Sequence, residues 1–116
     1  MVLSWFSAFL LTLSSESLAG LLLIRQPQWP AWKVILVICL GSCITHPILW
    51  FVLPRFFSDY TTFVTVGETW VWLTESVVMW LGLRPMTFGR ALLNSLLINI
   101  ASCLVGLILY ALGWSS

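Results

Sequence analysis

The chain consists of four long apolar stretches separated by short connections that hold most of its charged residues. The apolar stretches cover residues 2–24, 34–53, 61–83 and 91–114. A helix needs about 20 mostly apolar residues to cross the hydrocarbon core of a bilayer, which is about 30 Å thick. Each stretch meets that length. The pattern therefore predicts an all-α integral membrane protein with four transmembrane helices in one domain, residues 1–116.

The overall composition supports this fold class. Apolar residues make up 60% of the chain and charged residues only 8%, and the mean hydropathy is +1.04. These values are far from those of soluble globular domains, and the four predicted spans leave no room for one. A formal net charge of +1 gives no electrostatic basis for binding nucleic acid. The expected partner is a lipid bilayer.

The basic residues predict how the chain is oriented in the membrane. Four of the five flank the first and third connections: Arg25, Lys33, Arg84 and Arg90. Cytoplasmic connections carry an excess of Lys and Arg, so residues 25–33 and 84–90 are expected on the cytoplasmic side. Both termini then lie outside. The expected location is an inner or plasma membrane that the chain crosses several times.

The two halves of the chain, residues 2–53 and 61–114, repeat each other. Glu16 and Glu75 occupy matching places in the first stretch of each half. Each glutamate is followed nine residues later by an arginine, then by a short turn and a second apolar stretch. This spacing predicts two similar helical hairpins, related by a pseudo-twofold axis along the membrane normal.

Counting from the helix ends places a polar side chain at the middle of every predicted span. Glu16, Ser42, Glu75 and Asn99 each lie nine residues from the basic residue that flanks their helix. Nine residues of helix rise about 14 Å, which is close to the bilayer midplane. Carboxyl groups at that depth are costly and mark functional sites or pairing elements. The four side chains therefore predict a layer that binds a proton, a cation or a small polar ligand.

A second group of residues lies nearer the outer face. Glu68 precedes Glu75 by two helical turns, so the two carboxyls share one side of their helix. His46 lies thirteen residues after Lys33, on the second span. We expect Glu68 and His46 to form a polar track from the midplane layer to the outside.

The cysteines offer a weaker alternative, a metal site. Cys39, Cys43 and His46 follow one another at i, i+4 and i+7, so they share a helix face, and Glu68 could complete a ligand set. However, the chain contains no CxxC pair, and isolated cysteines often serve as small apolar residues.

Three classes of function remain open. The midplane layer favours a subunit that binds or transports a proton, a cation or a small polar ligand. The alternative is an accessory or assembly subunit of a larger membrane complex. An intramembrane enzyme that uses Glu and His is the third, and it is disfavoured because no known catalytic motif is present. The sequence identifies no cofactor. Four short helices enclose little volume, so a homo-oligomer or partner membrane subunits are expected.

Overall fold

The computed structural model describes residues 5–24 and 29–113. In this part of the chain there are four α-helices and no strand: α1 (Trp5–Leu23), α2 (Ala31–Phe51), α3 (Tyr60–Gly82) and α4 (Phe88–Ala111). A short 3-10 helix, η1 (Leu53–Phe56), follows α2. Each helix agrees with a predicted stretch to within three residues at either end. Residues 2–4, Arg25 and Trp114, which the sequence predictions include, lie outside the described residues.

Three of the four helices are long and apolar enough to cross a membrane: α1, α2 and α4. Helix α3 has 23 residues, so it does not lack length. It carries Glu68, Glu75 and several threonines, and these lower its hydropathy. The prediction of four helices is therefore confirmed, and three of them have the length and composition of a membrane span. Insertion into a membrane and the span at α3 remain predictions.

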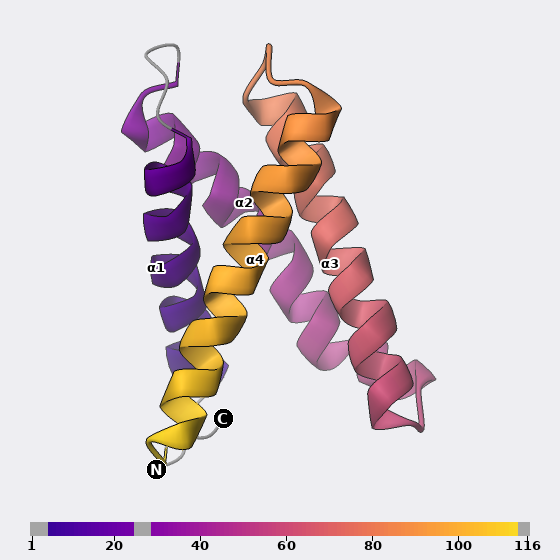
Figure 1. Cartoon of the computed structure of the whole chain (residues 1–116). Helices are drawn as coiled ribbons and strands as arrows, with labels where there is room; N and C mark the ends of the chain where they lie inside the picture. The colour runs from indigo at the N-terminus through magenta and orange to yellow at the C-terminus, as the bar shows by residue number, and fades with distance from the viewer. Residues whose placement is uncertain (1–4, 25–28, 114–116) are drawn as a thin grey trace.

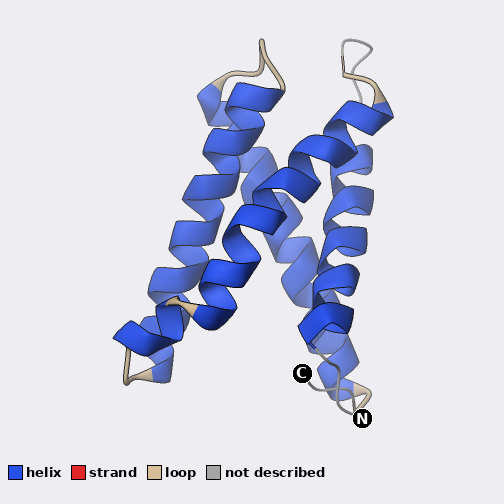
Figure 2. Cartoon of the chain, turned by 180° about the vertical axis from the view of Figure 1, so that it is seen from behind, coloured by secondary structure: helices blue, strands red, loops and turns tan. Residues whose placement is uncertain are grey.

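The helices alternate in direction and form a closed ring of contacts. Helix α1 packs against α2 and α4, and α3 packs against the same two neighbours. The end of α1, the start of α2 and the α3–α4 connection lie at one end of the bundle (Figure 1). The start of α1, the end of α4 and the α2–α3 connection lie at the other end, as the view from behind also shows (Figure 2).

Side-chain caps define where two of the helices begin. The Asp59 carboxylate accepts hydrogen bonds from the backbone amide of Thr62 at 2.9 Å and from its hydroxyl at 2.7 Å. The Thr87 hydroxyl accepts from the backbone amide of Arg90 at 3.3 Å. These caps satisfy amide groups that have no partner within the first helical turn. They fix the starts of α3 and α4 on opposite ends of the bundle.

Most of the buried apolar side chains lie in one half of the bundle, which we call the closed half. It contains the end of α1, the start of α2, the end of α3 and the start of α4. The buried apolar core lies there: Ile24, Trp29, Val34, Val37, Ile38, Met79, Leu83, Met86, Ala91 and Ile98. The Trp29 indole donates from Nε1 to the backbone oxygen of Arg84 at 3.2 Å, which ties the two hairpins together at this end.

The glycines show where neighbouring helices approach one another most closely. A methyl group added at Gly20 would lie 2.1 Å from Ile38 Cδ1, and one added at Gly82 would lie 2.6 Å from Val37 Cγ2. Both glycines therefore let neighbouring helices approach closely in the closed half. In the other half the contacts differ from place to place. A methyl group added at Gly67 on α3 would lie 2.7 Å from Leu49 Cδ1 on α2, whereas nothing lies within 4 Å of one added at Gly106, near the end of α4. We call the half that contains Gly106 and the chain ends the open half.

Candidate functional site

Two glutamates meet at one serine in the middle of the bundle. The Ser42 hydroxyl on α2 lies 2.6 Å from Glu16 Oε1 on α1 and 3.3 Å from Glu75 Oε2 on α3. The Thr45 hydroxyl, one turn further along α2, donates to Glu75 Oε2 at 3.3 Å. The exposed fraction is 2% for Glu16, 9% for Glu75 and 0% for Ser42. Three helices thus contribute to one buried cluster of two carboxyls and two hydroxyls.

The number of protons in this cluster limits its chemistry. A serine hydroxyl carries one proton, so Ser42 can make one full hydrogen bond as a donor. The shorter distance assigns that bond to Glu16. Glu75 can approach the same oxygen favourably when it is protonated and donates, or when a cation lies between the two carboxyls. The geometry therefore suits one proton shared by the two glutamates, or a bound cation that replaces it.

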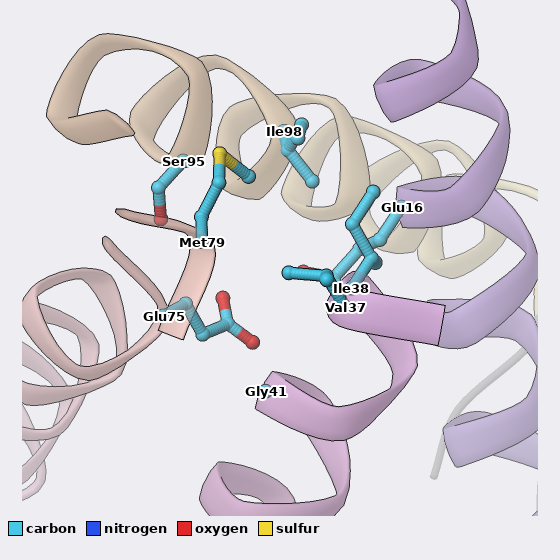
Figure 3. Close-up of a pocket in the computed structure, with 8 residues that line it drawn as sticks. All are labelled: Glu16, Val37, Ile38, Gly41, Glu75, Met79, Ser95 and Ile98. Atoms are coloured by element: carbon cyan, nitrogen blue, oxygen red, sulfur yellow. The ribbon is translucent and has the colours of Figure 1, made fainter. Parts of the chain in front are cut away.

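A small cavity adjoins the two carboxyls and is lined from all four helices. Its volume is about 20 Å³, which is room for about one water molecule. Helix α4 contributes Ser95 and Ile98 to its wall. The Glu75 carboxyl points from α3 toward the middle of the bundle, close to Gly41 of α2 (Figure 3). A methyl group at Gly41 would lie 3.4 Å from Glu75 Cγ, so the glycine sets how closely this side chain packs on α2.

Asn99, the fourth member of the predicted layer, flanks this cluster. Its side chain lies beside Glu75. Its amide nitrogen Nδ2 is buried and has no hydrogen-bond partner among the residues that the structure describes. Asn99 also lines a larger groove between α3 and α4. Of the four side chains predicted to lie at one level, Glu16, Ser42 and Glu75 are thus in direct contact, and the Asn99 amide lies at their edge.

The two residues predicted for the outward approach lie on different pairs of helices. Glu68 is exposed on α3 and lines the groove between α3 and α4, together with Asn99. His46 is partly buried on α2, and its ring lies 5.4 Å from the ring of Phe9 on α1. Its Nδ1 is buried and has no hydrogen-bond partner within the described ranges. The structure therefore places Glu68 in the α3–α4 groove and His46 in the α1–α2 contact, so it does not bring the two side chains together.

The cysteines do not gather around a common point. Cys39 Sγ lies 3.9 Å from the Ser17 hydroxyl between α1 and α2, and Cys43 is exposed. In residues 5–24 and 29–113, no three side chains of His, Cys, Asp or Glu come close enough together to hold a metal ion. Cys39, Cys43 and His46 share a helix face, but in the described structure they do not come together with Glu68 as ligands for a metal ion.

Sequence reasoning missed two contributors to the cluster. Thr45 donates to Glu75, and Gly41 makes room for it. Thr45 follows Ser42 by three residues, so helical spacing alone puts both hydroxyls on one face of α2. That signal was available in the sequence. The role of Gly41 was not, because it depends on which side chain of α3 lies opposite.

No family model, curated protein or solved structure matches this chain. The fold and the site by themselves define a class: a small four-helix protein with three candidate membrane spans and a carboxyl pair in its core.

Proposed function

We propose that the chain is a four-span membrane protein in which Glu16 and Glu75 form a proton-linked or cation-linked binding pair. The observation that carries this proposal is the contact of both carboxyls with one hydroxyl, Ser42, in the bundle core. Packing alone does not need a carboxyl, because leucine inserts into a membrane far more readily than glutamate. Two carboxyls brought together at such depth are suited to hold one positive charge between them.

The proposed topology has α3 as the fourth span, both termini outside and the closed half toward the cytoplasm. Arg84 and Arg90 lie at the closed end of α3 and α4, and the start of α1 and the end of α4 lie at the opposite end. This arrangement agrees with the positive-inside rule. Burial of Glu75 within the bundle supports a span at α3, because this carboxyl does not face the surroundings.

The proposed repeat of two hairpins is supported by the way the helices pack. Exchanging α1 with α3 and α2 with α4 leaves the set of neighbouring helices unchanged. The same exchange brings Glu16 onto Glu75, and both side chains lie at the bundle centre. A pseudo-twofold axis that runs between two equivalent carboxyls is a simple way to build a site for one shared charge.

In the proposed mechanism the pair exchanges a proton for a cation. With no cation present, one proton held between Glu16 and Glu75 removes part of the charge that would otherwise be buried. A cation that enters the adjoining cavity releases this proton, because both carboxyls then have a positive partner. Such an exchange is the elementary step of a proton-linked binding or transport subunit.

Proton release tests this function directly. Purified protein in weakly buffered detergent solution should release protons when NaCl, KCl or MgCl₂ is added, as followed with a pH-indicator dye. The double variant Glu16→Gln with Glu75→Gln should release none, because Gln keeps the shape and hydrogen bonding of Glu but does not titrate. Asp59→Asn is the matched control, since it removes an exposed carboxyl outside the bundle. It should behave as the parent protein.

One result would replace this function with the alternative. If the double variant folds, inserts and supports the same proton release and cellular phenotype as the parent, the glutamate pair is structural. The chain would then be better described as an accessory or assembly subunit, whose polar layer fixes only its own packing.

A further inference from the structure

The groove between α3 and α4 is a second site, separate from the cavity between the glutamates. Its volume is about 340 Å³, which lies within the range of about 300–1,000 Å³ common for small-molecule pockets. It opens in the open half, where α3 and α4 diverge from their connection (Figure 1). Its walls are mostly aliphatic and aromatic, with Trp72, Leu96 and Ile100 among them.

One charged group faces this apolar groove. Glu68 lines it, and the Glu68 side chain makes no hydrogen bond or ion pair with any other described residue. The described basic residues, Lys33, Arg55, Arg84 and Arg90, do not neutralise it, because they lie near helix ends, while Glu68 lies eight residues into α3, about 12 Å from its start. A parallel second copy would therefore also place no basic residue at this depth. The carboxylate needs a positive partner from elsewhere.

The groove wall next to Glu68 is held in place before any ligand binds. The Trp72 indole donates from Nε1 to the backbone oxygen of Leu92 on α4 at 2.9 Å. The backbone oxygen of Trp72 accepts from the hydroxyls of Ser76 at 2.7 Å and Ser95 at 3.3 Å. Because these side chains are already ordered, binding of a ligand would cost little free energy for ordering the wall of the groove. An indole beside a carboxylate also favours a cation, because both groups attract positive charge.

We propose that the α3–α4 groove binds an amphipathic organic cation, with the positive charge at Glu68 and the apolar body against Trp72, Leu96 and Ile100. An inorganic cation fits less well, because it requires about six or more oxygen ligands. The groove offers the Glu68 carboxylate, the Asn99 amide and the Thr69 hydroxyl, which already donates to the backbone oxygen of Thr65 at 2.7 Å. An acyl chain would fill the apolar volume but would leave the carboxylate without a partner. An organic cation meets both requirements.

Cys103 provides a direct reporter, since it lines this groove and is exposed. We suggest labelling with N-ethylmaleimide in lipid nanodiscs, using a variant that keeps only Cys103 (Cys39→Ser with Cys43→Ser). The probe is tetraphenylphosphonium, and the matched control is tetraphenylborate, an anion of the same shape. A second variant that keeps only Cys43 (Cys39→Ser with Cys103→Ser) reports on an exposed cysteine of α2 outside the groove.

The cation should protect Cys103, and the anion should not. At about ten times its Kd, tetraphenylphosphonium should slow labelling of Cys103 roughly tenfold, because only the unoccupied fraction reacts. Glu68→Gln should abolish this protection. The labelling rate of Cys103 without the probe should be the same in this variant as in its parent, which checks that the groove is still formed. Labelling of Cys43 should not change with either ion.

Three outcomes would overturn the proposal. Equal protection by the two ions would mean that the groove takes any apolar body. Protection that survives Glu68→Gln would remove the carboxylate from the site. Oxidative cross-linking of Cys103 between two copies, with no protection by the cation, would show that a second copy covers the groove. The double variant Glu16→Gln with Glu75→Gln should keep the protection, so this test can fail or succeed independently of the proposed glutamate pair.

Discussion

The acidic side chains of the bundle occupy two contrasting environments. Glu16 and Glu75 lie in the core, where a hydroxyl contacts both carboxyls and four helices surround them. Glu68 lies only two turns from Glu75 on the same helix, yet it is exposed in a groove and makes no hydrogen bond to the rest of the described chain. Burial with partners suits a group that holds a proton or a small cation. Exposure beside an apolar wall suits a group that attracts a larger cation.

The contrast arises from the shape of the bundle. In the closed half, glycines allow α1, α2 and α3 to approach closely, so a carboxyl has neighbours on every side. In the open half, α3 and α4 diverge, and the same helix face that carries Glu75 carries Glu68 at a surface. The environment of a carboxyl therefore depends on its position along the helix axis as well as on the side of the helix from which it projects.

The largest expected effect comes from replacing the core pair. Glu16→Gln with Glu75→Gln should abolish cation-linked proton release, whereas Glu68→Gln should leave most of it. Each single change in the core should impair release. If the carboxyls share one proton, the loss in the double variant should be smaller than the sum of the losses in the two single variants. The dye assay measures all four proteins. If Glu68→Gln reduced proton release as much as the double variant does, the core pair and the groove carboxyl would not have different roles.

A smaller effect is expected when the bridging hydroxyl is removed. Ser42→Ala leaves the buried Glu16 carboxyl without its donor, which should lower the free energy of unfolding by about 1–3 kcal/mol. Thr45→Val is the matched control. It removes a longer hydrogen bond to Glu75, which keeps its contact with Ser42, so it should cost about 0.5–1.5 kcal/mol. Denaturation in mixed detergent micelles compares the two. A larger loss for Thr45→Val would contradict the central place of Ser42.

The difference in packing between the halves can be tested with alanine at two glycines. Gly82→Ala would place a methyl group 2.6 Å from Val37 Cγ2 and should destabilise the protein by about 1–3 kcal/mol. Gly106→Ala meets nothing within 4 Å. It should stabilise α4 slightly, by up to about 1 kcal/mol, because alanine favours helix over glycine. Thermal unfolding of both variants in detergent checks this, and similar losses at both sites would remove the distinction between the close α2–α3 contact at Gly82 and the loosely packed end of α4.

Asp59 provides the reference for a carboxyl outside the bundle, and its effect should be the smallest. Hydrogen bonds from the hydroxyl and then the backbone amide of Thr62 hold its pKa below the ordinary value of 3.8. The carboxylate therefore contributes stability above the unfolded pKa and loses it as the pH falls through the folded pKa. Asp59→Asn should keep the helix cap but flatten the dependence of stability on pH below about pH 3.8. Thermal unfolding across this range measures it, and an unchanged slope would contradict the assignment.

Much of the fold could be predicted from hydrophobic length and punctuation alone. Four helices were expected at nearly their observed positions, because each apolar stretch ends at polar, proline or capping residues. The meeting of Glu16, Ser42 and Glu75 was also predictable, because distance from the helix end fixes depth.

The remainder depends on how the helices diverge, which sequence spacing does not encode. Glu68 shares a helix side with Glu75, so it was expected on a track with His46, but the divergence of α3 from α4 places it in a groove instead. His46 turns toward Phe9 because α1 and α2 pack closely at that level. Cys39 and Cys43 share helical spacing with His46, yet a shared helix face does not ensure that the side chains meet.

If Glu16 and Glu75 hold one charge between them, the two carboxyls must bind their protons in separate steps, and infrared spectroscopy can follow each step. The stretching band of protonated carboxyl groups should be followed against pH in the wild type and in Glu16→Gln and Glu75→Gln, each in the Glu68→Gln background. The pair should take up its two protons in well-separated steps, with one proton present over a broad range of pH. Each single variant should titrate in one step. If the two glutamates titrated independently, both would take up a proton at the same pH in the wild type, and the remaining glutamate would titrate at that same pH in each single variant. That result would contradict a shared charge.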